Sequence, residues 1–177
     1  MRTAFPLLLA LALVAGCSDA GPTASDPTDA RPVLDVSGTW DWSEVTHIRA
    51  TPFAAGAIFG VTPEGPVTHL SCPSAGTLTV AQTGETFSGT STQAPAVCTT
   101  RGGQTAPAPF PLALDITGEV RGRSLRFTFE TGGFPCHYRG SLRATGGTPT
   151  AWRATGGCEV PPEFGKDKIL DFVATRP

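Results

Sequence analysis

The sequence has little that would let it build helices or bind nucleic acid. Its 177 residues include 21 glycines and 17 prolines; both residue types destabilise helix interiors, and few long stretches escape them. Charged residues make up only 16% of the chain, with a formal net charge of −2. Domains that bind nucleic acid are strongly basic, so we expect neither a helical fold nor a nucleic-acid partner.

Long apolar runs are missing as well. The run Phe5–Ala15, which follows Met1 and Arg2, is too short to span a hydrocarbon core, because that takes roughly 20 residues. It has the length and the position of the apolar part of a secretory signal peptide. We therefore expect residues 1–16 to be a signal that directs export and is then removed.

The end of this run, Val14-Ala15-Gly16-Cys17, resembles the lipobox of bacterial lipoproteins. The resemblance implies that the signal is cut before Cys17, that the Cys17 sulfur receives a diacylglycerol, and that the new amine is acylated, for example with palmitate. Two or three acyl chains anchor a protein stably, since each buried methylene contributes about 0.8 kcal/mol. In such lipoproteins an Asp directly after the cysteine favours retention in the inner membrane. Here Ser18 holds that position, so the resemblance favours the outer membrane and does not specify the leaflet. A secreted protein with an incidental Cys17 is the alternative.

After the cysteine the composition changes twice. Residues 17–35 are rich in proline, serine, threonine, alanine and aspartate, which favours a flexible tether with little to bury. Residues 36–177 have the size of a single domain. The chain is therefore expected to consist of a signal peptide, a lipidated tether and one folded domain.

Apolar and polar residues alternate along much of this domain, which is typical of strands with one buried face. The clearest stretches are 76–93, 118–130, 138–157 and 169–175, and in the second of these Leu125, Phe127 and Phe129 share one face. Short strands joined by glycine-rich turns predict an all-β fold. We expect a single antiparallel up-and-down β-barrel of about eight strands, because a ring of hairpins closes without exposed edges; a β-sandwich is the alternative.

Five cysteines are an odd number for an exported protein, and lipidation of one leaves four that can pair in an oxidising compartment. Cys136 and Cys158 are equidistant from Gly147, so an antiparallel hairpin sets them opposite one another, within reach of a disulfide. The same register sets Leu142 opposite Trp152. We expect this hairpin to carry a disulfide.

Cys72 and Cys98 flank a second hairpin and are expected to form the other disulfide. In this hairpin no single register satisfies both the cysteines and the apolar residues. A register that aligns the two cysteines would put Phe87 on the face opposite Leu78, although both side chains belong inside. We therefore expect a bulge or a bent strand end near Pro95.

At the start of the domain, Gly38-Thr39-Trp40 resembles the Gly-x-Trp opening of the lipocalin and avidin (calycin) barrels. The resemblance implies an eight-stranded up-and-down barrel in which Trp40 plugs one end. It also implies that an arginine near the last strand packs across this tryptophan. Arg176 is placed to do so.

Motifs for catalysis and metal binding are absent from the sequence. There is no G-x-S-x-G, H-E-x-x-H or P-loop pattern, and His47, His69 and His137 lie on separate segments. The pairs His69/Cys72 and Cys136/His137 lack the CxxC or HxxxH spacing of metal ligands. We therefore expect a protein that is not an enzyme and that has no metal and no cofactor.

Two segments without clear alternation connect the expected strands. Thr51–Pro66 contains Phe53, Ile58 and Phe59 and is more apolar than loops usually are. It follows the first strand, where lipocalin-like folds place a lid over the open mouth, so we expect a ligand lid or a loop folded on its own side chains. The segment Gln93–Pro111 is rich in proline and glycine and is expected only to connect strands.

Four arginines alternate to the side away from the aromatic residues, and we call them the basic stripe: Arg126, Arg139, Arg143 and Arg153. Such a stripe suits anionic partners, such as envelope glycans or lipid head groups. It is equally the pattern of a solvated outer surface.

These features predict a non-enzymatic lipoprotein of the cell envelope, anchored to a membrane by lipid, whose barrel binds a small apolar or amphipathic ligand. The alternative is a structural module, or a module that binds proteins or glycans, with a barrel filled by its own side chains. Bulky inward residues such as Trp40 and Trp152 favour the alternative, since an eight-stranded barrel is only just wide enough for side chains to fill.

Overall fold

The computed structural model describes residues 32–131 and 134–177, so the expected signal peptide and Cys17 lie outside the described residues. One short helix, α1 (Pro52–Ala57), follows the first strand. The strands are β1 (Gly38–Ala50), β2 (Thr68–Thr83), β3 (Thr86–Gln93), β4 (Val97–Thr100), β5 (Thr105–Pro107), β6 (Ala113–Arg121), β7 (Ser124–Thr131), β8 (Phe134–Thr145), β9 (Thr148–Cys158) and β10 (Gly165–Thr175).

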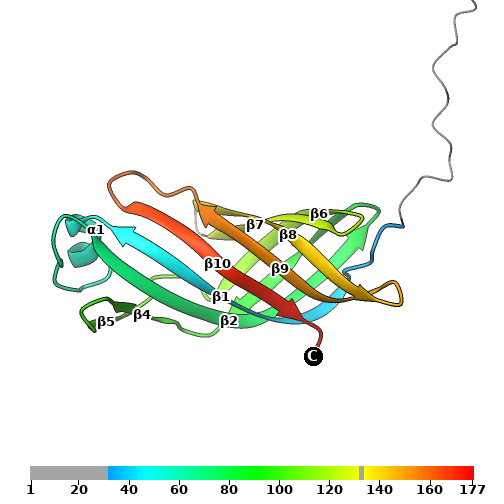
Figure 1. Ribbon diagram of the computed structural model, residues 1–177, viewed down its shortest axis with the longest axis horizontal. Coiled ribbons are helices and arrows are strands. Elements are labelled where there is room, and N and C mark those ends of the chain that lie inside the picture. The colour runs from blue at the N-terminus through cyan, green and yellow to red at the C-terminus, as the bar shows by residue number, and fades with distance from the viewer. Residues whose placement is uncertain (1–31, 132–133) are drawn as a thin grey trace, which may run out of the picture. The chain divides into compact units, whose positions relative to one another are not determined.

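All the strands except β4 and β5 form a closed ring (Figure 1). Its order is β1-β2-β3-β6-β7-β8-β9-β10, and β10 returns to β1. Every pairing is antiparallel, and β1 closes the ring by pairing with β2 on one side and β10 on the other. The predicted antiparallel up-and-down barrel of eight strands is confirmed.

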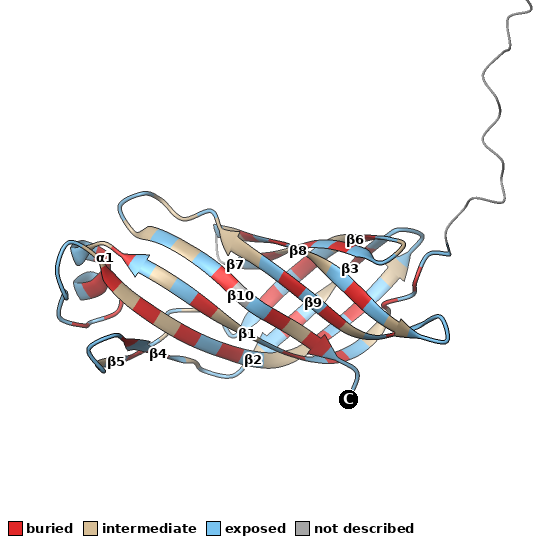
Figure 2. Ribbon diagram, in the orientation of Figure 1, coloured by how far each residue is buried: buried red, intermediate tan, exposed pale blue. Residues whose placement is uncertain are grey.

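Side chains alternate between the interior and the outer surface along each strand (Figure 2). In β7, Leu125, Phe127 and Phe129 point inward, and Leu142 and Trp152 lie opposite one another in β8 and β9, as the sequence predicts. Each of these side chains is almost completely buried, which stabilises the fold by roughly 1.5–3 kcal/mol per large apolar residue.

One end of the barrel is closed. Trp40 is fully buried there, and its Nε1 donates a hydrogen bond of 2.9 Å to the Val36 carbonyl. The guanidinium of Arg176 lies 4.5 Å from the centroid of the Trp40 ring, which is the packing that the calycin resemblance implies. Leu34 and Val36 are buried in the same apolar cluster, so packing begins before residue 36.

Both expected disulfides are present. Cys136 and Cys158 lie opposite one another in β8 and β9. Cys72, in β2, is bonded to Cys98, in β4. One disulfide therefore joins β2 to β4 and the other joins β8 to β9, and both lie toward the end of the barrel opposite Trp40.

The irregularity expected near Pro95 is also present. Strand β2 first pairs with β3, and the pairing of Val80 with Gly89 keeps Phe87 inside the barrel. Strand β3 ends at Gln93, and β4 begins beyond Pro95 and resumes the pairing with β2. Because the pairing with β2 is interrupted between β3 and β4, Phe87 can point into the barrel while Cys98 still reaches Cys72.

The segment Gln93–Pro111 does more than connect strands, so this prediction is wrong. Strands β4 and β5 form a small hairpin on the extension of β2. Cys98 and Ala106 pack there in a second apolar cluster, together with Ala54 and Phe59 from the other side of the mouth. Among the described residues, six of the nine that are buried in this cluster are alanine or cysteine, so few large side chains fill this end of the barrel.

The segment after β1 begins with a helix and not with an irregular loop. Thr51 caps α1, because its hydroxyl accepts a hydrogen bond of 3.2 Å from the Ala54 N–H. Pro52 occupies the first helical turn, where its fixed φ and missing N–H do no harm. Helix α1 turns the chain across the open end of the barrel (Figure 1).

Candidate binding site

The barrel is filled at the end near Trp40 and hollow at the other. The hollow is a cavity of about 310 Å³, within the range of roughly 300–1,000 Å³ typical of small-molecule sites. Most of its wall is apolar, and these residues are Trp42, Ile48, Ala54, Ile58, Phe59, Pro109, Phe110, Pro111, Leu114, Phe129, Phe134, Cys136, Tyr138, Cys158, Val160, Phe164 and Ile169.

An aromatic layer forms the floor of the cavity. Trp42 stacks on Phe172, with ring centroids 5.9 Å apart, and Phe129 lies 5.9 Å from Trp42 and 5.4 Å from Tyr138. All four side chains are buried. Because rings of this size fill the cross-section of an eight-stranded barrel, the cavity ends at this layer.

Two of the three residues expected in a lid line the cavity. Ile58 and Phe59, directly after α1, are 36% and 8% exposed and form part of the wall. Phe53 is 61% exposed and lies outside the wall, where its ring stacks on that of Phe164. Phe110, which comes from the opposite side of the mouth, also lines the cavity.

A carboxyl group, that of Glu44, lies in the apolar wall two residues after Trp42. Its Oε2 accepts a hydrogen bond of 2.9 Å from the Tyr138 hydroxyl, and its Oε1 accepts one of 3.4 Å from the Thr46 hydroxyl. Burial raises the pKa of Glu44 to about 7, and the hydrogen bonds oppose this rise. Burial and the charge of Glu44 raise the pKa of Tyr138 well above its usual value, which keeps the phenol a donor.

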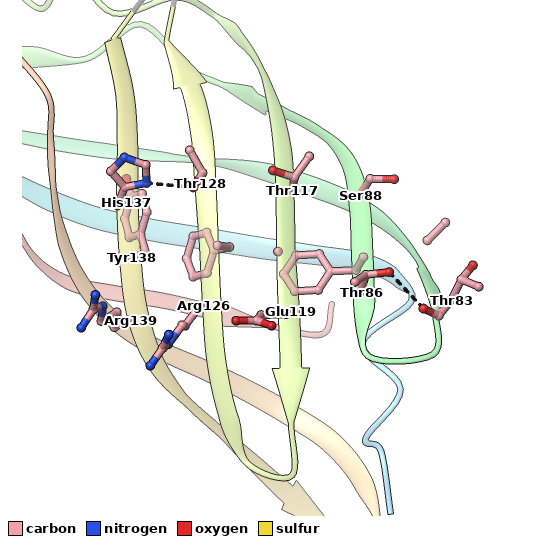
Figure 3. A pocket seen from close by; sticks show the side chains of 14 residues that line it. Thr83, Thr86, Ser88, Thr117, Glu119, Arg126, Thr128, His137, Tyr138 and Arg139 are labelled. Atoms are coloured by element: carbon pink, nitrogen blue, oxygen red, sulfur yellow. Dashed lines mark hydrogen bonds between the residues drawn. The ribbon is translucent and has the colours of Figure 1, made fainter.

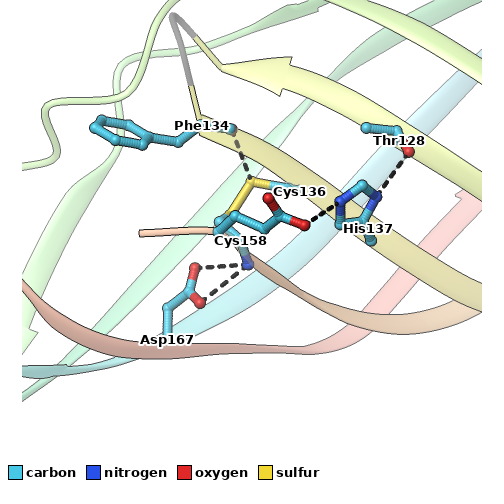
Figure 4. Close-up of polar contacts among 7 residues, drawn as sticks. Thr128, Phe134, Cys136, His137, Cys158 and Asp167 are labelled. Atoms are coloured by element: carbon cyan, nitrogen blue, oxygen red, sulfur yellow. Dashed lines mark hydrogen bonds and ion pairs between the residues drawn. A yellow bond between two sulfur atoms is a disulfide. The ribbon is translucent and has the colours of Figure 1, made fainter. Parts of the chain in front are cut away.

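A second carboxyl group, that of Asp167, faces the same cavity from β10. Both of its oxygens accept from the Cys158 backbone N–H, at 3.0 and 3.1 Å (Figure 4). Burial raises the pKa of Asp167, and the charge of Asp167 in turn raises the pKa of Glu44. Within the described wall, the one basic residue is Lys166, which is exposed. The polar part of the cavity is therefore acidic.

The wall also contains an unused hydrogen-bond donor. Trp42 is only 3% exposed, and its indole Nε1 has no hydrogen-bond partner in the described part of the chain. An unsatisfied buried donor costs about 1–3 kcal/mol. An acceptor atom on a bound molecule would remove this cost.

A second hollow, of about 680 Å³, lies on the outer surface of β3, β6, β7 and β8 (Figure 3). Its lining is mostly polar and includes Thr117, Glu119 and Arg126. Although it is the larger of the two, it is an open groove on a strand surface. It would bury much less of a small ligand than the cavity in the mouth.

His137 connects two neighbours beside this groove (Figure 4). Its Nδ1 lies 3.0 Å from the Thr128 hydroxyl, and its Nε2 lies 3.0 Å from Oε1 of Glu159. The order hydroxyl, imidazole, carboxylate is that of an activated nucleophile. However, the His137 and Glu159 side chains are 53% and 70% exposed, so the three groups lie on the open outer surface and not in the cavity. Their contacts connect β7, β8 and the residue that follows β9.

The basic stripe lies on the outer surface, and all four of its side chains are exposed. Arg126 and Arg139 lie directly opposite one another on β7 and β8, an arrangement that is unfavourable for like charges. Glu119 is opposite Arg126 on its other side but forms an ion pair of 3.1 Å with Arg121. Among the described residues, no ion pair involves the stripe.

The two cysteine–histidine pairs of the sequence do not come together as ligand sets, because Cys72 and Cys136 are both disulfide-bonded. Across 32–131 and 134–177, no helix has the length and apolar character needed to cross a bilayer. No protein-family model matches the chain, and comparison with curated proteins finds no significant match.

The acidic groups of the cavity are the functional candidates that sequence reasoning missed. A signal for Glu44 was present: in the first strand Trp40, Trp42 and Glu44 share one face, so the alternation that places the tryptophans inside also places the carboxyl group there. No comparable signal marks Asp167, because a register shift in β10 separates it from the inward residue Phe172.

The first prediction concerns the dependence of stability on pH. The pKa of Glu44 is raised in the folded state from 4.5 to about 7, so its contribution to stability is fully present below about pH 4.5 and is lost as the pH rises through 7. We expect the free energy of unfolding, measured in urea, to fall between pH 5 and 8 by up to about 3 kcal/mol. Asp167, whose pKa is also raised, acts in the same direction.

Glu44→Gln should remove most of this dependence. The control Glu130→Gln alters a carboxyl group that is exposed on the outer surface and should leave the dependence unchanged. A wild-type stability that is constant or rises across this range, or a Glu44→Gln variant with the wild-type slope, would contradict the assignment of Glu44.

Proposed function

We propose that the protein is a non-enzymatic lipoprotein of the cell envelope whose barrel binds a small apolar or amphipathic molecule. The observation that supports ligand binding is the cavity of about 310 Å³ in the mouth of the barrel, with its apolar wall. Cavities of this size and lining are the usual binding sites of small molecules. The lipobox supports the anchor.

The direction of the cavity suits an anchored protein. The described chain enters the barrel at the closed end, where Leu34 and Val36 pack beside Trp40, and the cavity opens at the end that carries α1, β4 and β5 (Figure 1). Anchoring through residues before Leu34 would therefore attach the barrel at the end opposite the mouth.

The basic stripe supports a second candidate, the interaction module that binds an anionic partner. The specific observation is the exposed pair of Arg126 and Arg139, which face one another and form no ion pair with a carboxylate of the described residues. A sulfate, phosphate or carboxylate group bound by both guanidiniums would relieve their repulsion. An anionic glycan of the cell envelope would offer such groups in series.

Uptake of an uncharged fluorescent probe, N-phenylnaphthylamine, tests ligand binding. The double variant Ile58→Ala/Phe59→Ala removes two side chains from the cavity wall and should weaken uptake by about tenfold or more, since each removes apolar contact area. The matched control Phe53→Ala changes a residue of the same segment that lies outside the wall and should change uptake little.

Thermal melting of the same variants separates a lost contact from a lost fold. If the wild-type chain takes up no probe, or if Phe53→Ala weakens uptake as much as the double variant, the mouth is not the binding site. The interaction module then remains as the proposed function.

A separate prediction tests the anchor. Cys17→Ser should move the protein from the membrane fraction to the soluble fraction and leave the melting temperature of the barrel unchanged, because the apolar clusters of the described residues are formed by Leu34 and residues after it. The control Ser18→Ala should keep the protein in the membrane fraction. If the Cys17→Ser variant still fractionates with membranes until detergent is added, the lipobox assignment is wrong.

A further inference from the structure

We propose that the ligand of the mouth cavity is a small amphipathic amine, whose apolar body contacts the aromatic wall and whose ammonium group binds Glu44. This inference rests on the proposed function, because it requires that the cavity binds a small molecule. It adds the chemical class of the molecule and the residue that selects it.

The first support is the position of the carboxyl groups. Glu44 and Asp167 are the two acidic residues of the described cavity wall and come from β1 and β10, which pair directly. The Glu44 oxygens each accept one hydrogen bond, from Tyr138 and Thr46. A carboxylate oxygen accepts more than one hydrogen bond, so acceptor capacity is left for a ligand.

The second support is the lack of a compensating cation. Lys166 is the one basic residue in the described wall, and it is exposed. A half-buried carboxylate without a cationic neighbour is poorly solvated. An ammonium group in the cavity would supply the missing charge, whereas a carboxylate ligand would meet two groups of its own sign.

The third support is the aromatic wall. Trp42, Phe129 and Tyr138 form the floor beside Glu44, and cations are attracted to the faces of such rings. Trp42 and Glu44 are two residues apart on the same face of β1, so their side chains are neighbours.

The charge state of Glu44 makes such binding depend on pH. The groups that face Glu44 are Tyr138 from β8, Asp167 from β10 and Thr46 on its own strand, with Lys166 at the wall. Since the pKa of Glu44 is about 7, the carboxylate is present at pH 8 and largely protonated at pH 6. Binding of an ammonium group should therefore be tighter at pH 8 and should release a proton from Glu44 at pH 6.

Three probes with the same chain test the inference: octylamine, octanol and octanoate. Binding is measured by titration calorimetry at pH 8 on the full chain carrying Cys17→Ser. The ammonium group of octylamine, like that of lysine, stays charged at this pH. We expect octylamine to bind about tenfold more tightly than octanol, because hydrogen bonds between charged groups are the stronger ones, and octanoate to bind most weakly.

Glu44→Gln should abolish the advantage of octylamine, so that octylamine and octanol bind the variant with equal affinity. Thermal melting of the variant shows whether it is folded. The control Glu130→Gln, on the outer surface, should keep the preference for the amine.

The outcomes separate the two proposals. If octanol binds but octylamine has no advantage, or if the advantage survives in Glu44→Gln, the amine is the wrong class and ligand binding stands. If none of the three probes binds to the wild-type chain, both proposals fail.

Discussion

The whole structure depends on how far aromatic side chains fill an eight-stranded ring. The interior of such a ring accommodates little more than its own side chains. From Trp40 at the closed end to Trp42 and Phe172, inward residues are large and in mutual contact. Beyond Trp42 the inward positions of β1 hold Glu44, Thr46 and partly buried Ile48 instead. The cavity exists because the filling stops there.

At the open end of the barrel, where few large side chains pack together, disulfides and hydrogen bonds stabilise the strands. Each disulfide joins strands on this side of the aromatic layer, at Cys72–Cys98 and Cys136–Cys158. A disulfide that closes a loop of this length stabilises a protein by about 3 kcal/mol in the chain-entropy picture. Asp167 adds hydrogen bonds to the backbone of Cys158. These disulfides and hydrogen bonds therefore stabilise the strands around the cavity although no side chains fill it.

Local patterns explain what the sequence predicted correctly. The alternation of Leu125, Phe127 and Phe129 fixes an inward face, because the side-chain period of a strand is two. The pairing of Cys136 with Cys158 follows from their symmetry about a short turn. Neither inference needs knowledge of the distant parts of the chain.

The features that the sequence analysis missed depend on contacts between distant parts of the chain or have only a weak signal in the sequence. Whether a ring of this size encloses a cavity depends on side chains from all its strands, so it could not be predicted from any one segment. The helix that places Ile58 and Phe59 in the wall and Phe53 outside it was signalled only by Thr51-Pro52, a cap followed by proline at the first helical position. The hairpin of β4 and β5 is too short to give an alternating pattern of its own.

Native mass spectrometry of the chain purified from its own host tests the central claim, that the mouth of the barrel holds a small molecule. The cavity of about 310 Å³ and its acidic wall predict a non-covalent adduct that is released by gentle activation, contains an apolar body and carries a basic nitrogen. A spectrum that contains only the chain, with or without covalent modifications, under conditions that preserve non-covalent complexes, would contradict the claim.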